Sequence, residues 1–99
     1  MTISNKNKEF LDELIEYYIN EAQSYKEMAQ EYSPKTNSVV DTAFGLIIGC
    51  VYSSFLHAYS NQQQAPSSED LQEFREIIMI NSRMIKDAII QKSDSMLET

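Results

Sequence analysis

The sequence predicts an all-α fold, built as three long helices in an antiparallel, up-down-up bundle. Apolar residues recur at three- and four-residue spacing through three segments of the 99-residue chain. Polar runs that contain a proline interrupt this pattern near residues 33–37 and 61–66. There is no internal repeat and no glycine-rich linker, so residues 1–99 form a single domain in this prediction.

The first helix is predicted over residues 5–32. It ends at Ser33–Pro34, because the residue before a proline is pushed out of the α region. A second apolar strip, formed by Ile15, Ile19 and Ala22, lies beside the main one and favours contact with a partner. The main apolar stripe, predicted to face the core, consists of Leu11, Leu14, Tyr18, Tyr25, Met28 and Tyr32.

The second helix is predicted over residues 38–61. Asn37 or Ser38 can cap its start, and Asp41 places a carboxylate in the first turn, where the helix dipole favours negative charge. Between residues 39 and 59 only Asp41 and His57 readily carry charge, and apolar residues point to more than one side of the helix. A helix that is apolar nearly all round is usually buried. The sequence therefore predicts a buried central helix.

The third helix is predicted over residues 68–93. Ser67 is the expected N-cap, and Asp70 completes a reciprocal pair with it. About five residues at the chain end are expected to fray. The apolar stripe expected to face the core contains Leu71, Phe74, Ile77, Ile78, Met84, Ile85, Ala88 and Ile89.

Charge and cysteine content exclude several classes of function. The chain carries 15 Asp and Glu against 8 Lys and Arg, a net charge of −7. Such a surface repels nucleic acid and anionic lipid headgroups, so neither is an expected partner. Cys50 is the single cysteine, which fits a reducing compartment, and the first residues resemble no secretory signal. We therefore expect a cytoplasmic protein.

Residues 39–59 must also be weighed as a membrane span. The segment has 21 residues, close to the roughly 20 that cross a bilayer. Asp41, Ser53, Ser54 and His57 all lie within it, and both flanking helices are amphipathic in the manner of bundle partners. The expectation is a helix of the protein core and no membrane contact.

No residue pattern identifies catalytic, cofactor-binding or metal-binding machinery. His57 is the only histidine and has no ligand at metal-binding spacing, while Cys50 has no base near it in sequence. The acidic pairs Glu13-x-x-Glu16 and Glu73-x-x-Glu76 could gather around magnesium on two antiparallel helices. They also fit a solvated helix face, which is the interpretation we favour.

The two glycines of the second predicted helix point to an interface. Gly45 and Gly49 lie four residues apart and would let another backbone approach closely, either in a second copy or within the same chain. Tyrosines on the first helix combine apolar area with a polar tip, which also suits an interface. The candidate interface residues are Gly45, Gly49, Ile15, Ile19, Tyr18 and Tyr25.

These features predict a non-enzymatic, cytoplasmic protein–protein interaction module that self-associates, with a two-fold homodimer as the expected state. A domain of this size has a thin core, burying about 60% of its unfolded surface, so dimerisation would help complete it. An alternative is an acidic binder of another protein, such as a secretion chaperone, an antitoxin-like or immunity-like protein, or a phage-type inhibitor. A further alternative is a metal-dependent nucleotide hydrolase that uses the clustered carboxylates.

Overall fold

Four α-helices make up most of the residues that the structure describes. The computed structural model describes the backbone of residues 2–97 and the side chains of residues 2–90. The described residues contain no strand, so the predicted all-α class is confirmed. The elements are α1 (Asn5–Asn20), α2 (Ala22–Glu31), the 3₁₀ helix η1 (Ser33–Lys35), α3 (Val39–Asn61) and α4 (Ser68–Leu97).

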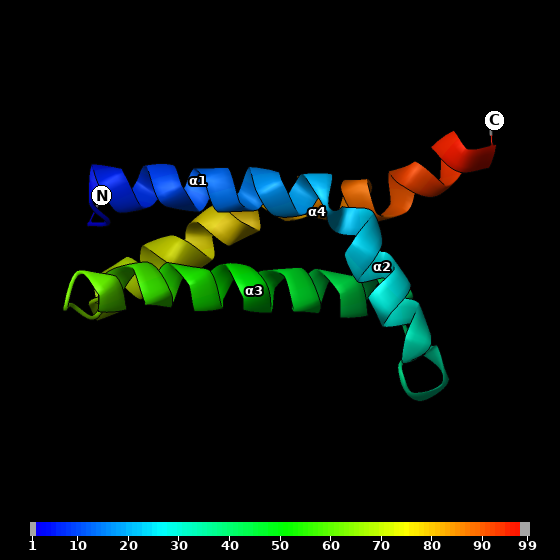
Figure 1. Cartoon of the computed structure of the whole chain (residues 1–99), viewed down its shortest axis with the longest axis horizontal. Helices are drawn as coiled ribbons and strands as arrows, with labels where there is room; N and C mark the ends of the chain where they lie inside the picture. The colour runs from blue at the N-terminus through cyan, green and yellow to red at the C-terminus, as the bar shows by residue number, and fades with distance from the viewer. Residues whose placement is uncertain (1, 98–99) are drawn as a thin grey trace.

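The chain runs along α1, turns sharply into α2, returns along α3 and then passes behind them along α4 (Figure 1). Each of α1, α2 and α4 contacts α3. The core lies where these elements meet, and its largest fully buried side chains are Phe55, Leu11, Ile47, Ile85, Ile89 and Val51.

The predicted first helix is two helices, so the expectation of one continuous helix over residues 5–32 and of three helices in all is wrong. The chain bends at Glu21, although no proline or glycine lies there. Beyond the bend, Ala22 and Ala29 are buried, and their small side chains let α2 pack closely on its neighbours α3 and α4. The Gln23 side-chain amide donates to the backbone carbonyls of Ala88 and Ile89 in α4, at 3.1 and 2.9 Å. These tertiary contacts hold the bend.

The bend also changes which apolar side chains reach the core. From the stripe predicted for the first helix, Leu11 is fully buried, but Met28 and Tyr32 are 42% and 57% exposed. Ile15 and Ala22, which were assigned to the second strip, are buried instead. Because α2 turns away from the axis of α1, one straight stripe cannot describe both segments.

Only one side of α3 is buried, which corrects the prediction that this helix is enclosed nearly all round. Its buried residues recur every four positions: Ala43, Ile47, Val51, Phe55 and Tyr59. The three neighbouring helices cover this single row and leave the opposite side open. The apolar content of α3 therefore exceeds what one copy of the chain covers.

The helix ends follow the predicted capping chemistry. Ser38 Oγ accepts from the Asp41 amide at 3.0 Å, which confirms Ser38 as the cap of α3. At the start of α4, Ser67 Oγ accepts from the Asp70 amide at 3.0 Å, and Asp70 Oδ2 accepts from the Ser67 amide at 3.3 Å. The α4 backbone continues to Leu97, past the predicted end at residue 93. The fraying predicted for the chain end falls in part on residues 98–99, outside the described residues.

The N-terminal segment is fastened to α4, a contact that sequence reasoning missed. Ile3 is 3% exposed and belongs to the core. Glu73 Oε1 accepts from the backbone amides of Thr2 and Ile3, at 2.8 and 2.9 Å. Hydrogen bonds from Ile3 and Thr2 lower the pKa of Glu73 below its ordinary 4.5. Bonds from Thr2 and Tyr59 likewise lower the pKa of Asp70 below 3.8.

These lowered pKa values predict acid sensitivity. A carboxylate whose pKa is lower in the folded state stabilises the fold above its unfolded pKa, and this stabilisation disappears as the pH falls through the folded value. For Glu73 the loss begins as the pH drops below 4.5. We expect Glu73→Gln to melt at a lower temperature than the wild type near neutral pH and to lose less stability on acidification. Thermal melts at pH values from neutral to below 4.5 are the measurement. Glu76→Gln is the control, because Glu76 is an exposed glutamate on the same helix. Equal pH profiles for all three proteins would contradict this role of Glu73.

Candidate interaction surface

The open side of α3 carries a row of six exposed residues at four-residue spacing. We call this row the α3 outer row; it consists of Asp41, Gly45, Gly49, Ser53, His57 and Asn61. Half-buried apolar side chains, including Leu46, Ile48 and Leu56, flank it. Between Asp41 and His57 the row contains only Gly45, Gly49 and Ser53, which are small and uncharged. Another backbone could therefore approach α3 closely along most of its length.

The two glycines of the row face open space. A side-chain carbon built at Gly45 or Gly49 would meet nothing within 4 Å. The alternative in which these glycines allow two helices of the same chain to pack closely is therefore wrong. Glycine costs about 1 kcal/mol relative to alanine in a helix interior. Among the described residues, nothing packs into the space beside Gly45 and Gly49, so no contact within one copy offsets this cost.

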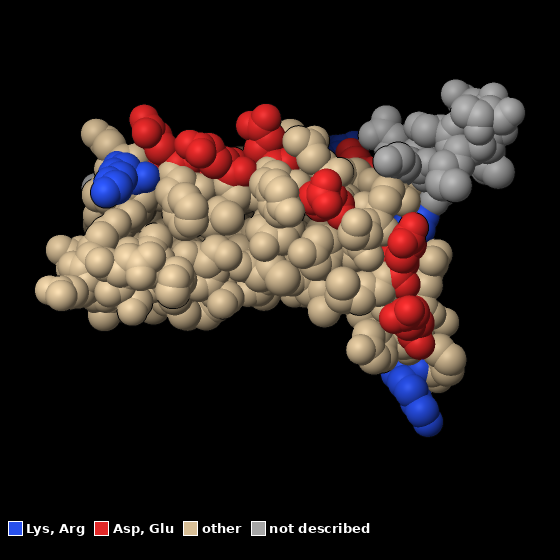
Figure 2. Space-filling model, viewed as in Figure 1, with Lys and Arg blue, Asp and Glu red and all other residues tan. Residues whose placement is uncertain are grey.

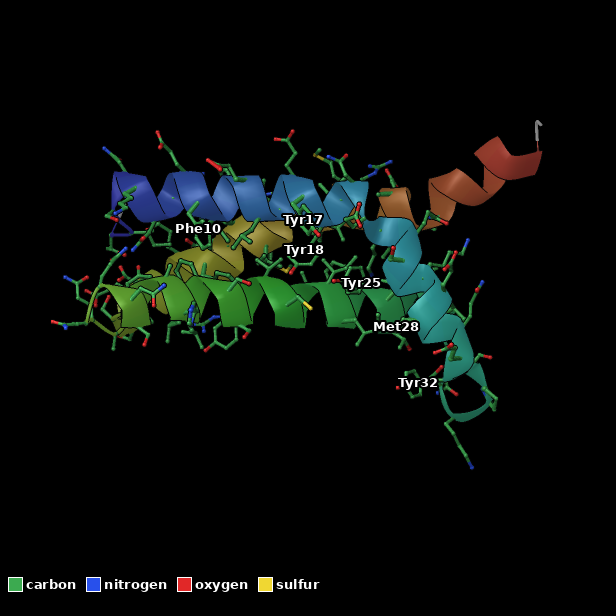
Figure 3. The ribbon with its side chains drawn as sticks, in the orientation of Figure 1. Phe10, Tyr17, Tyr18, Tyr25, Met28 and Tyr32 are labelled. Carbon is green, nitrogen blue, oxygen red and sulfur yellow. The ribbon has the colours of Figure 1, made fainter. Side chains whose placement is uncertain are left out.

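A row of aromatic and methionine side chains follows α1 and then descends along α2 (Figure 3). Tyr17 packs edge-on against Tyr18, with ring centroids 5.0 Å apart, and Tyr18 packs similarly against Tyr25 at 5.6 Å. The most exposed members are Tyr17 and Tyr32, at 56% and 57%. This row adds apolar surface to the side of the molecule on which α1 and α3 lie next to each other.

The other predicted interface residues lie deeper than expected. Ile15 is 4% exposed, so its assignment to an interface is wrong and it is a core residue. Ile19, Tyr18 and Tyr25 are half-buried and pack against the core. The pKa of Tyr25 is raised to about 12, mainly by burial and also by the neighbouring Cys50 thiol and Tyr18. These three side chains support the core and present only their edges to solvent.

A second apolar patch lies on α4. Met79, Ile80 and Met84 are 73%, 79% and 59% exposed, and Ile90 is 49% exposed. The prediction that Met84 faces the core is therefore wrong. Arg83 and Asp87, whose Nε and Oδ2 atoms are 4.0 Å apart, lie between Met79 and Ile80 around the helix and so divide the patch. The four-residue spacing of Ile80 and Met84 places them on one face, so α4 offers a contact surface separate from α3.

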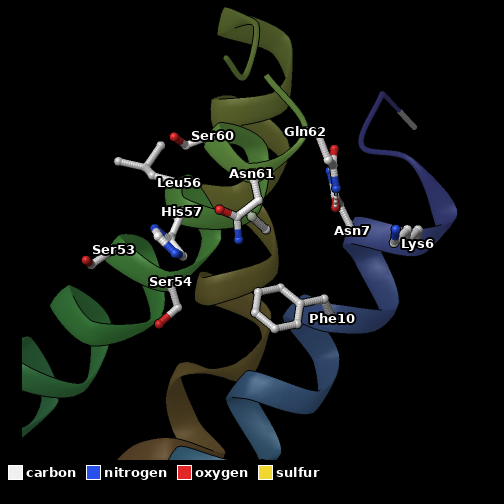
Figure 4. Close-up of a pocket in the computed structure, with 11 residues that line it drawn as sticks. Lys6, Asn7, Phe10, Ser53, Ser54, Leu56, His57, Ser60, Asn61 and Gln62 are labelled. Carbon is white, nitrogen blue, oxygen red and sulfur yellow. Dashed lines mark hydrogen bonds between the residues drawn. The ribbon is translucent and has the colours of Figure 1, made fainter. Parts of the chain in front are cut away.

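A pocket of about 760 Å³ lies between the start of α1 and the last two turns of α3. Figure 4 shows Phe10 of α1 on one side and His57 and Ser54 of α3 on the other. Ser53, His57 and Asn61 of the α3 outer row line this pocket, together with Lys6 of α1. The pocket is thus an extension of the row, with hydroxyl, imidazole, amide and ammonium groups at its surface.

Two amide side chains close one end of this pocket. The Asn7 Nδ2 group donates to Gln62 Oε1 at 3.2 Å, and Gln62 Nε2 donates back to Asn7 Oδ1 at 2.8 Å. Asn7 is only 3% exposed, and this reciprocal pair satisfies its side chain. The pair ties α1 to the end of α3, so the pocket is held by a fixed contact between its two sides.

The acidic pairs considered as magnesium ligands are not brought together. Glu13 and Glu16 are exposed on α1, and Glu76 is exposed on α4, while Glu73 is engaged with the Thr2 and Ile3 amides. Within residues 2–90, no group of three or more His, Cys, Asp or Glu side chains could hold a metal ion. These acids are placed as solvated or hydrogen-bonded side chains.

Charge divides the molecular surface. Acidic side chains follow the edge of α1 and the side of α2, whereas the α3 surface in the same view carries no charged residue (Figure 2). The acids that give the chain its net charge of −7 therefore lie away from this part of α3. A second acidic molecule could approach α3 with little electrostatic repulsion.

No protein-family model, curated protein or solved structure matches this chain. The fold defines its class as a small all-α domain, with four α-helices in the part that the structure describes. Sequence reasoning identified Gly45 and Gly49 but missed the row to which they belong. The four-residue spacing of small and polar residues from Asp41 to Asn61 is the signal that could have revealed it.

Proposed function

We propose that this protein is a non-enzymatic helical interaction module that self-associates as a two-fold homodimer through the open side of α3. The observation that carries this proposal is the empty space around Gly45 and Gly49 on an exposed, apolar helix. Only 22% of the most apolar 18-residue window of α3 is buried. A second copy would cover this surface.

Physical chemistry favours a second copy of the same chain. Two-fold pairs are the commonest closed assemblies, and each copy would supply the same α3 outer row with the apolar side chains that flank it. The thin core expected of a small domain gains from added burial, at about 25 cal/mol for each Å² of apolar surface removed from water. A reducing cytoplasm, in which the single Cys50 thiol stays free, is the compartment proposed for this dimer.

The molar mass of the chain tests the proposal. Light scattering on a sizing column should give about twice 11.4 kDa for the wild type. Gly49→Leu should shift the mass toward 11.4 kDa, because the new side chain would hold the two backbones apart. Within one chain a Cβ atom at this position meets nothing within 4 Å, and leucine is the better helix former by about 1 kcal/mol. The monomeric variant should therefore remain folded.

Gln30→Leu is the matched control, since it adds the same side chain at an exposed position of α2. It should leave the mass of the dimer unchanged. A wild type that stays at 11.4 kDa over a wide concentration range would overturn the proposal, as would a Gly49→Leu protein that remains dimeric.

A second function, binding of a different protein, is favoured by the α4 patch. Met79 and Ile80 are the most exposed large apolar side chains among the described residues. Methionine adapts its shape readily and is frequent at protein-binding surfaces. A monomeric wild type would favour this function over self-association.

By length and composition α3 could also cross a membrane. Its contacts with α1, α2 and α4, and the Asp41 and His57 side chains on its open side, support a place in a folded domain instead. Recovery of the protein without detergent is the expected result, and a requirement for detergent would favour the membrane.

A further inference from the structure

The two ends of the α3 outer row differ in chemistry. Asp41 places a carboxylate at one end, and His57 places an imidazole near the other. Each lies eight positions from Gly49, which corresponds to about 12 Å along the helix axis. Gly49 is therefore the midpoint between an acceptor and a donor.

An antiparallel two-fold pair centred on Gly49 brings these groups together. In this register Gly49 faces Gly49 of the second copy, Gly45 faces Ser53, and Asp41 faces His57. The contact between Asp41 and His57 forms twice because the pair is symmetric. A parallel pair would instead place the two Asp41 carboxylates near each other, and like charges in close contact oppose association.

The geometry of an α-helix permits this register. Residues four apart form a ridge that is inclined to the helix axis, and two such ridges interdigitate when the helices cross at about 50°. The same crossing keeps the ends of the two rows near each other, although each row winds around its helix. Glycine at the centre lets the axes approach more closely than side chains would allow.

The pocket beside His57 supplies further complementarity. It contains Lys6, for which no ion pair occurs among the described residues, in a chain of net charge −7. Asp41 already contacts Lys86 of its own chain at 3.3 Å, yet its side chain is 70% exposed and keeps a free side. The pocket, about 760 Å³ in volume, is lined by polar groups of Ser53, His57 and Asn61 that can hydrogen-bond a carboxylate.

We propose that two copies pair antiparallel along the α3 outer row, centred on Gly49, with Asp41 of each copy inserted beside His57 and Lys6 in the pocket of the other. This inference rests on the proposed self-association and specifies its register. It assigns the pocket an occupant, the first turn of α3 in the second copy.

Disulfide mapping tests the register. In a Cys50→Ala background, Gly45→Cys and Ser53→Cys chains are prepared separately, then mixed and oxidised under mild conditions. The antiparallel register predicts a disulfide between the two different chains and little product from either chain alone. Gln30→Cys, on exposed α2, gives the background level from random collisions.

The outcomes separate the register from the dimer itself. Efficient disulfides within the Gly45→Cys protein alone would indicate a parallel pair and overturn the register. The Cys50→Ala protein could be dimeric while every mixture gives no more disulfide than Gln30→Cys does. That result would overturn the register and leave the proposed function standing. A monomeric mass at all concentrations would overturn both.

Charge exchange provides an independent test. Asp41→Lys and His57→Glu should each raise the dimer Kd by about tenfold or more, because each places like charges together. The double variant restores an opposite pair and should return to within about threefold of the wild type. Lys86→Gln, which removes only the contact of Asp41 within its own chain, should change Kd by less than about twofold. A double variant as weak as the two single effects combined would overturn the pairing.

Discussion

Phe55→Ala is expected to lower the free energy of unfolding by about 3–5 kcal/mol. Phe55 is fully buried in the second half of α3. Its ring packs against Tyr59 with centroids 5.0 Å apart and against Phe74 of α4 at 4.8 Å. Removing the ring leaves a cavity between α3 and α4. The expected loss of stability is a large part of the total for a typical domain, which is about 5–15 kcal/mol.

Tyr32→Ala is the matched control for this prediction, because Tyr32 is 57% exposed and lies outside the pocket that the proposed dimer fills. Its loss should cost about 1 kcal/mol or less. Urea denaturation followed by circular dichroism measures both variants, at one fixed chain concentration because self-association adds to the measured stability. Equal losses at the two positions would contradict the place of Phe55 in the core.

Ala29→Leu is expected to have the second-largest effect, a loss of about 1–3 kcal/mol. Ala29 is fully buried in α2, which packs on both α3 and α4, so a larger side chain has no space and must push α2 away from its neighbours. The same substitution should weaken the bend at Glu21, because this packing holds α2 in its direction.

Gln30→Leu adds the same side chain one residue further along, on the exposed side of α2. It should change stability by about 0.5 kcal/mol or less. Amide hydrogen exchange adds a local measurement: protection of α2 should fall in Ala29→Leu and remain in Gln30→Leu. Unchanged protection in both would show that the crossing tolerates a larger side chain.

Helix capping shows how far local chemistry reaches. Ser38 with Asp41, and Ser67 with Asp70, mark two helix starts in the sequence, and the hydrogen bonds at both places follow. These interactions join residues three positions apart, so they need no information about the rest of the fold. The end of α3 also depends on residues close together in the sequence, since the Gln62 amide donates to the Tyr59 carbonyl. Gln63, which follows, adopts a positive φ of 58°, a conformation that favours glycine.

The bend at Glu21 shows where local reasoning fails. Apolar spacing continues through it, and no helix-breaking residue marks it. Its support comes from the packing of α2 on α3 and α4, and from Gln23, which donates to the carbonyls of Ala88 and Ile89 more than sixty positions away. A pattern read along the chain cannot register contacts between distant segments.

The sequence by itself determined the all-α class, the capped helix starts and the two glycines of the candidate interface, because each depends on spacing within one or two helical turns. Tertiary structure decided the division of the first helix, the burial of Ile15 and the exposure of one side of α3. These depend on how many neighbouring helices one chain can place around α3. Three neighbours cover only the row from Ala43 to Tyr59, and the opposite row, from Asp41 to Asn61, remains open.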